Sequence, residues 1–193
     1  MPKKLGPLKI PWPVPAPDDD PYWDFFIKQP AEDHRNLATE IMRRASEGNV
    51  FPTKAELHTP EITASHLKEL ARYLGAQLVG IVDLRRQDPE VAQGYPFAIV
   101  AVVQSVYDPR TSPGFGGQAG AKDALYVTYV LSAYIRELGY RATAAVDEAA
   151  ERLAEVAGLG RLNAEGRLVV PKYGNKVHVS DVIRTDLPMT ADG

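Results

Sequence analysis

The chain has 193 residues, of which 45% are hydrophobic, so it is long enough to form one globular domain with a sizeable core. Its formal net charge is -3 and its lysines and arginines are scattered, which argues against binding to a nucleic-acid backbone. It contains no cysteine, which excludes disulfides, thiolate zinc sites and an iron–sulfur cluster held by its own thiolates.

The first 30 residues are predicted to form a proline-rich extended arm. Residues 7–21 contain six prolines and the acidic run Asp18–Asp20, a composition typical of polyproline-like segments. Trp12 and the aromatic run Tyr22–Phe26 are too apolar to remain in water, so we expect the arm to lie along the domain or along a partner subunit. A packed extension is favoured over a strap that holds a homodimer together.

The sequence also predicts where the protein resides. No apolar run approaches the roughly 20 residues of a membrane span, and the N-terminal segment has too much proline for the apolar core of a signal peptide. Arg43 and Arg44 lie inside a helical pattern with no apolar run after them, so they do not resemble a twin-arginine export signal. We therefore expect a cytoplasmic protein that does not associate with membranes.

Residues 31–193 are predicted to form a single α/β domain. Apolar residues at helical spacing that end at glycines indicate its helices, and short β-branched runs between breakers indicate its strands. This order predicts a mixed sheet flanked by helices. Helices are expected at 31–48, 59–75, 121–139 and 147–158, and strands at 76–84, 97–107, 140–146, 166–171 and 175–183.

Two of these helices carry a recognisable start. Thr59 is followed by Pro60, which is the combination expected at an N-cap and the first helical position. Asp147 follows a predicted strand, and its carboxylate can cap the helix that ends at Gly158. An aspartate in such a position is more often a helix cap than a catalytic acid.

The chain lacks the usual motifs of hydrolases and nucleotide-dependent enzymes. It has no G-x-S-x-G elbow, no P-loop and no cysteine nucleophile. Gly114–Ala119 fits the dinucleotide pattern G-x-G-x-x-A, but it does not follow its strand directly, so a flexible lid or a loop near a ligand is favoured. The histidines lack the sequence spacing of metal ligands, and no metal site is predicted. They are His34, His58, His66 and His178.

The most unusual segment is Ala157–Gly174, which holds four glycines and a proline between two apolar runs. Such glycines either form turns or let the backbone approach something large and flat. A second feature is the predicted helix 121–139, which is apolar on most faces and carries Tyr126, Tyr129 and Tyr134. A tyrosine stripe is more often part of a core than catalytic.

The run Tyr134–Pro188 resembles the corrinoid-binding domain of the reductive dehalogenases and, more distantly, of epoxyqueuosine reductase. The resemblance rests on four pieces in the family's order and at about its spacing, namely YIRELGY, AGLG, GRLVVPKYG and TDLP. It extends over roughly residues 61–190, with the weakest support before Ala121. It implies a nitroreductase-like α/β sandwich that binds cobalamin, base-off and with its nucleotide tail inside the protein.

The resemblance implies four cofactor-binding residues. Gly158, Gly160, Tyr173 and Gly174 match the family motif, and the glycines would let the main chain approach the corrin ring and its side amides. The alternative is that Gly158 only ends a helix and Gly174 only forms a hairpin turn.

Three catalytic residues are predicted on the same basis. Asp147 lies where epoxyqueuosine reductases carry an aspartate that supplies a proton. Tyr126 or Tyr129 comes from the helix region in which dehalogenases place their tyrosine. A tyrosine donor would need a nearby cation to lower its pKa, and Lys122 or Arg110 could supply one.

The chain departs from the family pattern at two places. Asn163 replaces a glycine of the motif, and the arginine that follows this glycine in the family is displaced. The sequence ends at TDLPMTADG, where the resembled enzymes continue into a ferredoxin-like segment with clustered cysteines. We therefore expect a separate iron–sulfur or flavin protein to supply electrons.

The leading hypothesis is a stand-alone cobalamin-binding protein, either the corrinoid-holding component of a reductive dehalogenase-like reductase or a cobalamin carrier. Two alternatives stay open. One is a non-enzymatic interaction or structural subunit that kept the fold and lost the cofactor. The other is a flavin-binding reductase of the nitroreductase type, which rests on analogy of fold alone.

Overall fold

The computed structural model describes residues 41–42, 48–87, 90, 92, 94–105, 119–145 and 149–192. The helices are α3 (Pro60–Tyr73), α4 (Ala119–Glu137) and α5 (Ala150–Val156), and η1 (Leu84–Arg86) is a 3-10 turn. The strands are β1 (Leu78–Asp83), β2 (Phe97–Gln104), β3 (Ala142–Ala145), β4 (Arg161–Leu162), β5 (Leu168–Val169), β6 (Val177–Val179) and β7 (Val182–Thr185).

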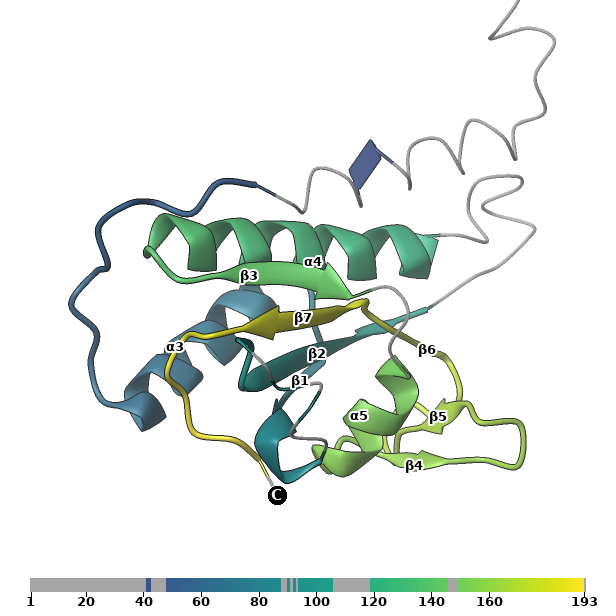
Figure 1. Ribbon diagram of the computed structural model, residues 1–193. Coiled ribbons are helices and arrows are strands. Elements are labelled where there is room, and N and C mark those ends of the chain that lie inside the picture. The colour runs from purple at the N-terminus through teal and green to yellow at the C-terminus, as the bar shows by residue number, and fades with distance from the viewer. Residues whose placement is uncertain are drawn as a thin grey trace, which may run out of the picture.

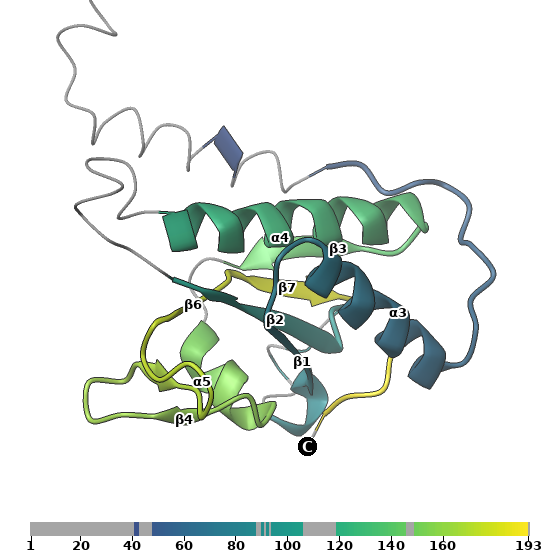
Figure 2. The ribbon, with the colours of Figure 1, turned by 180° about the vertical axis from the view of Figure 1, so that it is seen from behind.

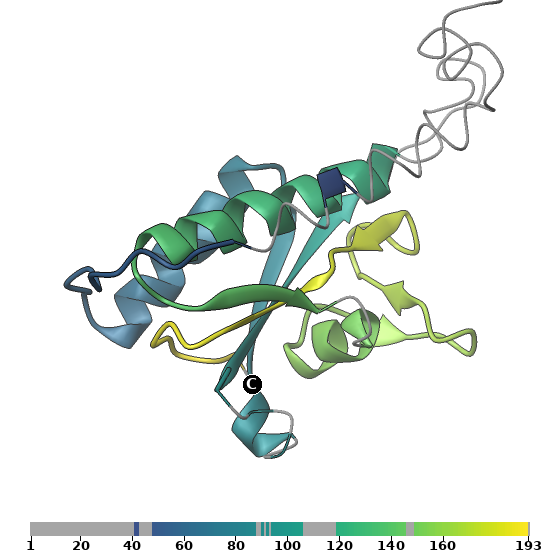
Figure 3. The ribbon, with the colours of Figure 1, turned by 45° about the horizontal axis from the view of Figure 1, so that its top comes forward.

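These elements form three layers. Helices α3 and α4 cover one face of a five-stranded sheet, and α5 covers the other face together with the small sheet of β4 and β5 (Figures 1, 2 and 3). Among the described residues, no helix combines the length and the apolar character needed to cross a bilayer.

The main sheet is antiparallel at every pairing that the structure describes. Its strand order is β1-β2-β7-β3, and β6 pairs with the other end of β2. The expectation of a mixed sheet was therefore wrong. Periodicity identifies strands, but strand direction depends on how the connections fold back, and this information is not local.

Strand β2 is the centre of the molecule because both of its faces are buried. Phe97, Ile99, Ala101 and Val103 face the core beneath α3 and α4. The intervening residues, Ala98, Val100 and Val102, face α5 and the small sheet. A strand buried on both sides is apolar throughout instead of alternating, which is why its sequence is a continuous hydrophobic run.

The predicted strand 175–183 is in fact two strands separated by a β-bulge. Val179 pairs with Val102, whereas Ile183 pairs with Ile99, so this side has one extra residue. Ser180 lies at the break, where its backbone N–H donates to the carbonyl oxygen of Ala101 (2.8 Å) and its hydroxyl accepts from the Ala101 N–H (2.9 Å). The side-chain oxygen thus replaces a backbone acceptor at the bulge.

The predicted start of α3 is confirmed, but that of α5 was wrong. Thr59 is the N-cap of α3, with its hydroxyl accepting from the N–H of Ile62, and Pro60 is in the first turn. Helix α5 begins at Ala150 with Ala149 as its N-cap, and Ala149 has no side chain that can cap. Asp147 is therefore not the N-cap residue.

Several predictions concern segments outside the described residues. These segments include the arm 1–30, most of the predicted helix 31–48, the glycine-rich residues 114–118 and Asp147 itself. Of the predicted helix 31–48, Ile41, Met42 and Gly48 are described; the first two are helical, and Gly48, the predicted stop, is not. The extent of this helix and the placement of the arm stay predictions.

Candidate functional site

Helix α5, strands β4 and β5 and the turn that follows them form one compact unit, which we call the glycine lobe (residues 150–175). It packs on the face of the sheet opposite α3 and α4 (Figure 3). Leu168 and Val170 anchor it in the core beside Val100 and Val102. The lobe contains all four residues that were predicted to bind a cofactor, so the structure brings these four into one small region.

Gly158 and Gly174 both occupy turns. Gly158 ends α5 with a φ of +74°, and its N–H donates to the carbonyl oxygen of Glu155 (2.9 Å). Gly174 has a φ of +60° and closes a turn in which its N–H and carbonyl group both bond to Val170. Positive φ angles favour glycine for backbone reasons alone. No atom lies within 4 Å of a Cβ placed on either glycine, so both also leave open space beside the main chain.

Gly160 has a different reason to lack a side chain. A Cβ at this position would lie 2.5 Å from the carbonyl oxygen of Val169 on the neighbouring strand. The lobe's own backbone therefore requires a glycine here, whether or not a ligand is bound.

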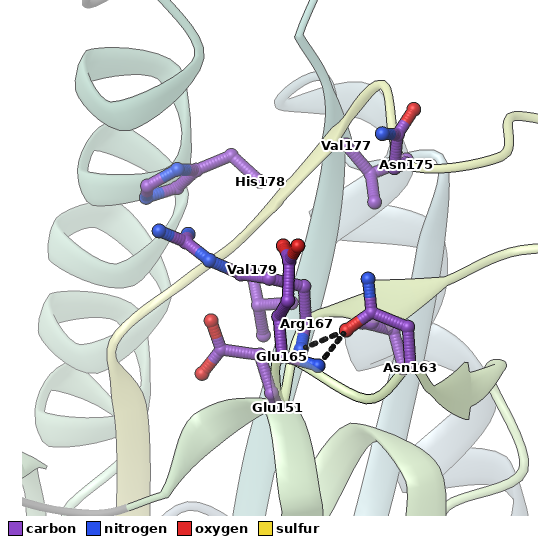
Figure 4. Close-up of a pocket in the computed structure, with 9 residues that line it drawn as sticks. Glu151, Asn163, Glu165, Arg167, Asn175, Val177, His178 and Val179 are labelled. Atoms are coloured by element: carbon purple, nitrogen blue, oxygen red, sulfur yellow. Dashed lines mark hydrogen bonds between the residues drawn. The ribbon is translucent and has the colours of Figure 1, made fainter.

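At Asn163 the chain departs from the family motif, which has a glycine there, and the asparagine itself stabilises the turn at this position. Asn163 Oδ1 accepts from the backbone N–H groups of Glu165 (3.0 Å) and Arg167 (2.9 Å), as drawn in Figure 4. Its own N–H donates to the carbonyl oxygen of Arg167. An asparagine side chain can thus hold the β4–β5 turn without the glycine of the family motif.

A pocket of about 390 Å³ opens beside Gly158. Its walls come from the lobe and from the edge strand β1. Tyr173 forms one side, and its hydroxyl donates to Oε1 of Gln77 (3.0 Å). Two predicted cofactor-binding residues, Gly158 and Tyr173, therefore line the same cavity. The lining residues are Gln77, Leu78, Gly158, Leu159, Val170, Pro171, Lys172 and Tyr173.

A second, more polar pocket of about 250 Å³ lies between the β4–β5 turn, β6 and the start of α5. Figure 4 shows the side chains of Arg167 and His178 on the α4 side of this pocket and those of Asn163 and Asn175 across from them. Glu151 from the first turn of α5 also lines it. His178 could not be singled out within its strand from the sequence, because only the fold places it beside the lobe.

Tyr126 and Tyr129 lie away from the glycine lobe. Both are on α4, across the sheet from α5, and their exposed fractions are 46% and 36%. Arg136 lies near Tyr129, and burial lowers the pKa of its guanidinium, an effect that the neighbouring Tyr129 and Glu137 only partly oppose. Lys122, one candidate cation, forms an ion pair with its neighbour Asp123. Neither tyrosine lines the pocket beside Gly158, and the catalytic role of the tyrosines stays a prediction.

The fold also brings together two histidines that are not paired in the sequence. The rings of His58 and His66 are 5.7 Å apart and perpendicular, beside a pocket that Tyr134 also lines. No group of three or more potential ligands (His, Cys, Asp or Glu) that could hold a metal ion occurs in the described part of the chain. The pair is separated by eight positions across a helix start, a spacing that no metal-ligand motif would have indicated.

Comparison with known proteins gives matches only at the level of structure. The chain matches no protein-family model and no curated protein. The structure of a reductive dehalogenase that suggests a mechanism for B12-dependent dehalogenation matches 86% of the chain with a TM-score of 0.73 and 25% identity. This chain has a reductive dehalogenase-like fold. The structure of the catabolic reductive dehalogenase NpRdhA also matches 84% of this chain, with a TM-score of 0.72 and 25% identity.

The reductive dehalogenase-like fold is only part of each dehalogenase, because this chain spans 25% of the length of either. Epoxyqueuosine reductase from Bacillus subtilis shares the fold more distantly, with a TM-score of 0.52, 14% identity and coverage of 68% of this chain and 47% of the reductase. The predicted family resemblance is thus confirmed for the fold. The finer description as nitroreductase-like stays a prediction.

Proposed function

We propose that this chain binds a corrinoid on its glycine lobe and serves as the cofactor-holding component of a reductase. The observation that carries the proposal is the match of 86% of the chain to a dehalogenase described as B12-dependent. The glycine motif that resembles that family lies in the glycine lobe, where Gly158 and Tyr173 line the pocket of about 390 Å³. Cobalamin is the corrinoid that we expect, in the base-off form.

The residues of the lobe fit one part of such a ligand. A corrinoid is larger than either pocket, but Gly158 and Gly174 leave the main chain uncovered on one side. The pocket beside Gly158 also has apolar walls, including Leu159 and Pro171, next to the ring of Tyr173. An open backbone between apolar walls is suited to the edge of a flat ring that carries amide side chains.

Within this proposal, the chain's own residues bind and orient the cofactor. When bound, a corrinoid supplies a cobalt centre that accepts and donates electrons. Gly158 and Gly174 would admit the ligand to the backbone, and Tyr173, held by its hydrogen bond to Gln77, would fix one wall of the pocket. The polar pocket, with Arg167 and His178, would offer hydrogen-bond donors to anionic or carbonyl groups.

For proton supply we favour Asp147 over the tyrosines. Glu151, four residues after Asp147, lines the polar pocket of the lobe. Tyr126 and Tyr129 instead lie on α4, which covers the opposite face of the sheet. A general acid must come within hydrogen-bonding reach of the reacting group. Of the three candidates, only Asp147 is close in sequence to a residue that lines a pocket of the lobe, which supports it for this role.

Electrons would come from another protein or from a further polypeptide segment. The sequence has no cysteine to ligate an iron–sulfur cluster, so a separate iron–sulfur or flavin protein is the expected donor. A cobalamin carrier would need the same lobe to bind its cargo, but it would need no electron donor. Reduction of the bound corrinoid by such a donor, followed by turnover of a substrate, would separate the two roles.

The proposal is tested by mixing the purified chain with hydroxocobalamin, removing free ligand on a desalting column and recording the visible spectrum. We expect the protein fraction to retain a corrin spectrum shifted towards the base-off form. An empty eluate under both oxidising and reducing conditions would contradict the proposal. If the chain then retained added flavin, this would indicate a flavin reductase. If it bound neither cofactor, this would indicate an interaction subunit.

Two matched glycine variants locate the binding site. Gly158 and Gly166 have the same φ of +74°, and a Cβ added to either would meet no atom within 4 Å, so alanine strains the backbone equally at both. Only Gly158 lines the pocket of about 390 Å³. We expect Gly158→Ala to weaken cobalamin binding about tenfold and Gly166→Ala to leave it unchanged. Equal affinities for the two variants would show that the ligand binds elsewhere.

A further inference from the structure

The middle turns of α4 carry apolar side chains on their outward face, although this face points away from the core. The inward face of this helix is formed by Ala124, Val127, Leu131 and Ile135, each 1% exposed or less. The opposite side carries Tyr126 and Tyr129, with Val130 and Ala133 half-buried beside them. We call these four residues the tyrosine face. A helix that is apolar on both sides is normally covered on both sides.

The described chain leads directly to this face. The N–H of Phe51 donates to the carbonyl oxygen of Arg136 near the end of α4 (2.9 Å), and Gly48 lies against the Arg136 guanidinium. Further towards the N-terminus, the short helical segment Ile41–Met42 lies on the outer side of α4 in all three ribbon views (Figures 1, 2 and 3). The described segment that the first 40 residues lead into thus lies beside α4.

The N-terminal segment has the composition that an apolar helix face would bind. It contains Trp12, Tyr22, Trp23, Phe25 and Phe26 among its prolines. Helix α4 has 19 residues and is about 28 Å long, whereas an extended chain of 40 residues reaches much further. A proline-rich segment is already extended and loses little conformational entropy on docking, and aromatic rings pack favourably on one another.

We propose that residues 12–26 dock on the tyrosine face of α4 in the same chain. Tethering at Ile41–Met42 keeps the arm at high effective concentration beside its own α4, which favours this occupant over a second copy of the chain. Tyr126 and Tyr129 are then anchors for the arm. This inference does not depend on the corrinoid proposal, because the tyrosine face and the glycine lobe lie on opposite sides of the sheet.

Tryptophan fluorescence tests the proposal directly, because Trp12 and Trp23 are the two tryptophans of the chain and both lie in the docking segment. We expect the full-length protein to emit at shorter wavelength, and to be quenched less by acrylamide, than the same protein in denaturant. The double variant Tyr126→Glu/Tyr129→Glu should shift the emission towards that of the denatured chain. Circular dichroism should remain native, since both side chains are exposed.

Matched controls separate docking from general effects of added charge. Tyr73→Glu changes a tyrosine of α3 that is 87% exposed and should leave the emission unchanged. Tyr126→Phe/Tyr129→Phe keeps the rings and should also keep docking. Native-like emission in the double glutamate variant would overturn the proposal, as would denatured-like emission in the unmodified protein. Emission that changes with protein concentration as a dimer forms would overturn it in favour of docking between copies.

Discussion

Gly80 shows how a single residue sets the distance between two layers. It lies within β1, and a Cβ at this position would be 2.4 Å from the Cβ of Ala157 at the end of α5. No pair of non-bonded carbon atoms tolerates this separation, so the end of α5 can lie this close to β1 only because residue 80 has no side chain. Sequence analysis placed Gly80 inside a strand but could not assign its partner, which is 77 positions away.

We expect Gly80→Ala to destabilise the protein by about 1–3 kcal/mol, because α5 must move away from the sheet. Urea unfolding of the variant and the unmodified protein measures the difference in unfolding free energy. The double variant Gly80→Ala/Ala157→Gly removes the facing methyl group and should recover part of the loss. Additive effects of the two substitutions would show that they do not meet in the folded protein.

At the scale of elements, the glycine lobe depends on its turns more than on its strands. Strands β4 and β5 have two residues each, far fewer than the predicted strand 166–171. The turn between them is held by the three hydrogen bonds that link Asn163 to Glu165 and Arg167. Hydrophobic patterning predicts where a strand lies but not where its pairing stops, because a partner of two residues is too short to leave a pattern.

We expect the side chain of Asn163 to stabilise the β4–β5 turn. Asn163→Ala removes the acceptor of two backbone N–H groups and should lower the unfolding free energy by about 0.5–1.5 kcal/mol. Asn163→Asp keeps an acceptor oxygen in the same place and should be close to neutral. Denaturant unfolding distinguishes the two, and equal loss in both variants would mean that the side-chain hydrogen bonds do not hold the turn.

At the scale of the whole molecule, residues near the end of the described chain join α3 to the sheet. Asp192 forms an ion pair with Lys68 of α3 and accepts from the N–H of Ile81 on β1 (2.9 Å). Its own N–H donates to the carbonyl oxygen of Ile81 (2.8 Å). This carboxylate thus connects a helix, an edge strand and the C-terminal segment, which also covers the outer edge of β1.

We expect Asp192→Ala to lower the unfolding free energy by about 1–2 kcal/mol and to speed hydrogen exchange at the Ile81 amide. Asp192→Asn keeps an acceptor for Ile81 but loses the ion pair. It should therefore protect that amide better than the alanine variant does. Unchanged exchange in the alanine variant would show that the edge of β1 does not depend on this carboxylate.

The sequence by itself determined the order of the helices and main strands from α3 to α5, the capped start of α3 and the position of the glycine motif. These features depend on neighbouring residues, through helical spacing, β-branched runs and turn-forming residues. The tertiary structure alone decided that the sheet is antiparallel, that β6 and β7 are separate and that the predicted tyrosines lie across the sheet from the glycines. The physical reason is that strand pairing and the choice of face depend on contacts between residues distant in the sequence, such as Gly80 with Ala157 and Asp192 with Ile81.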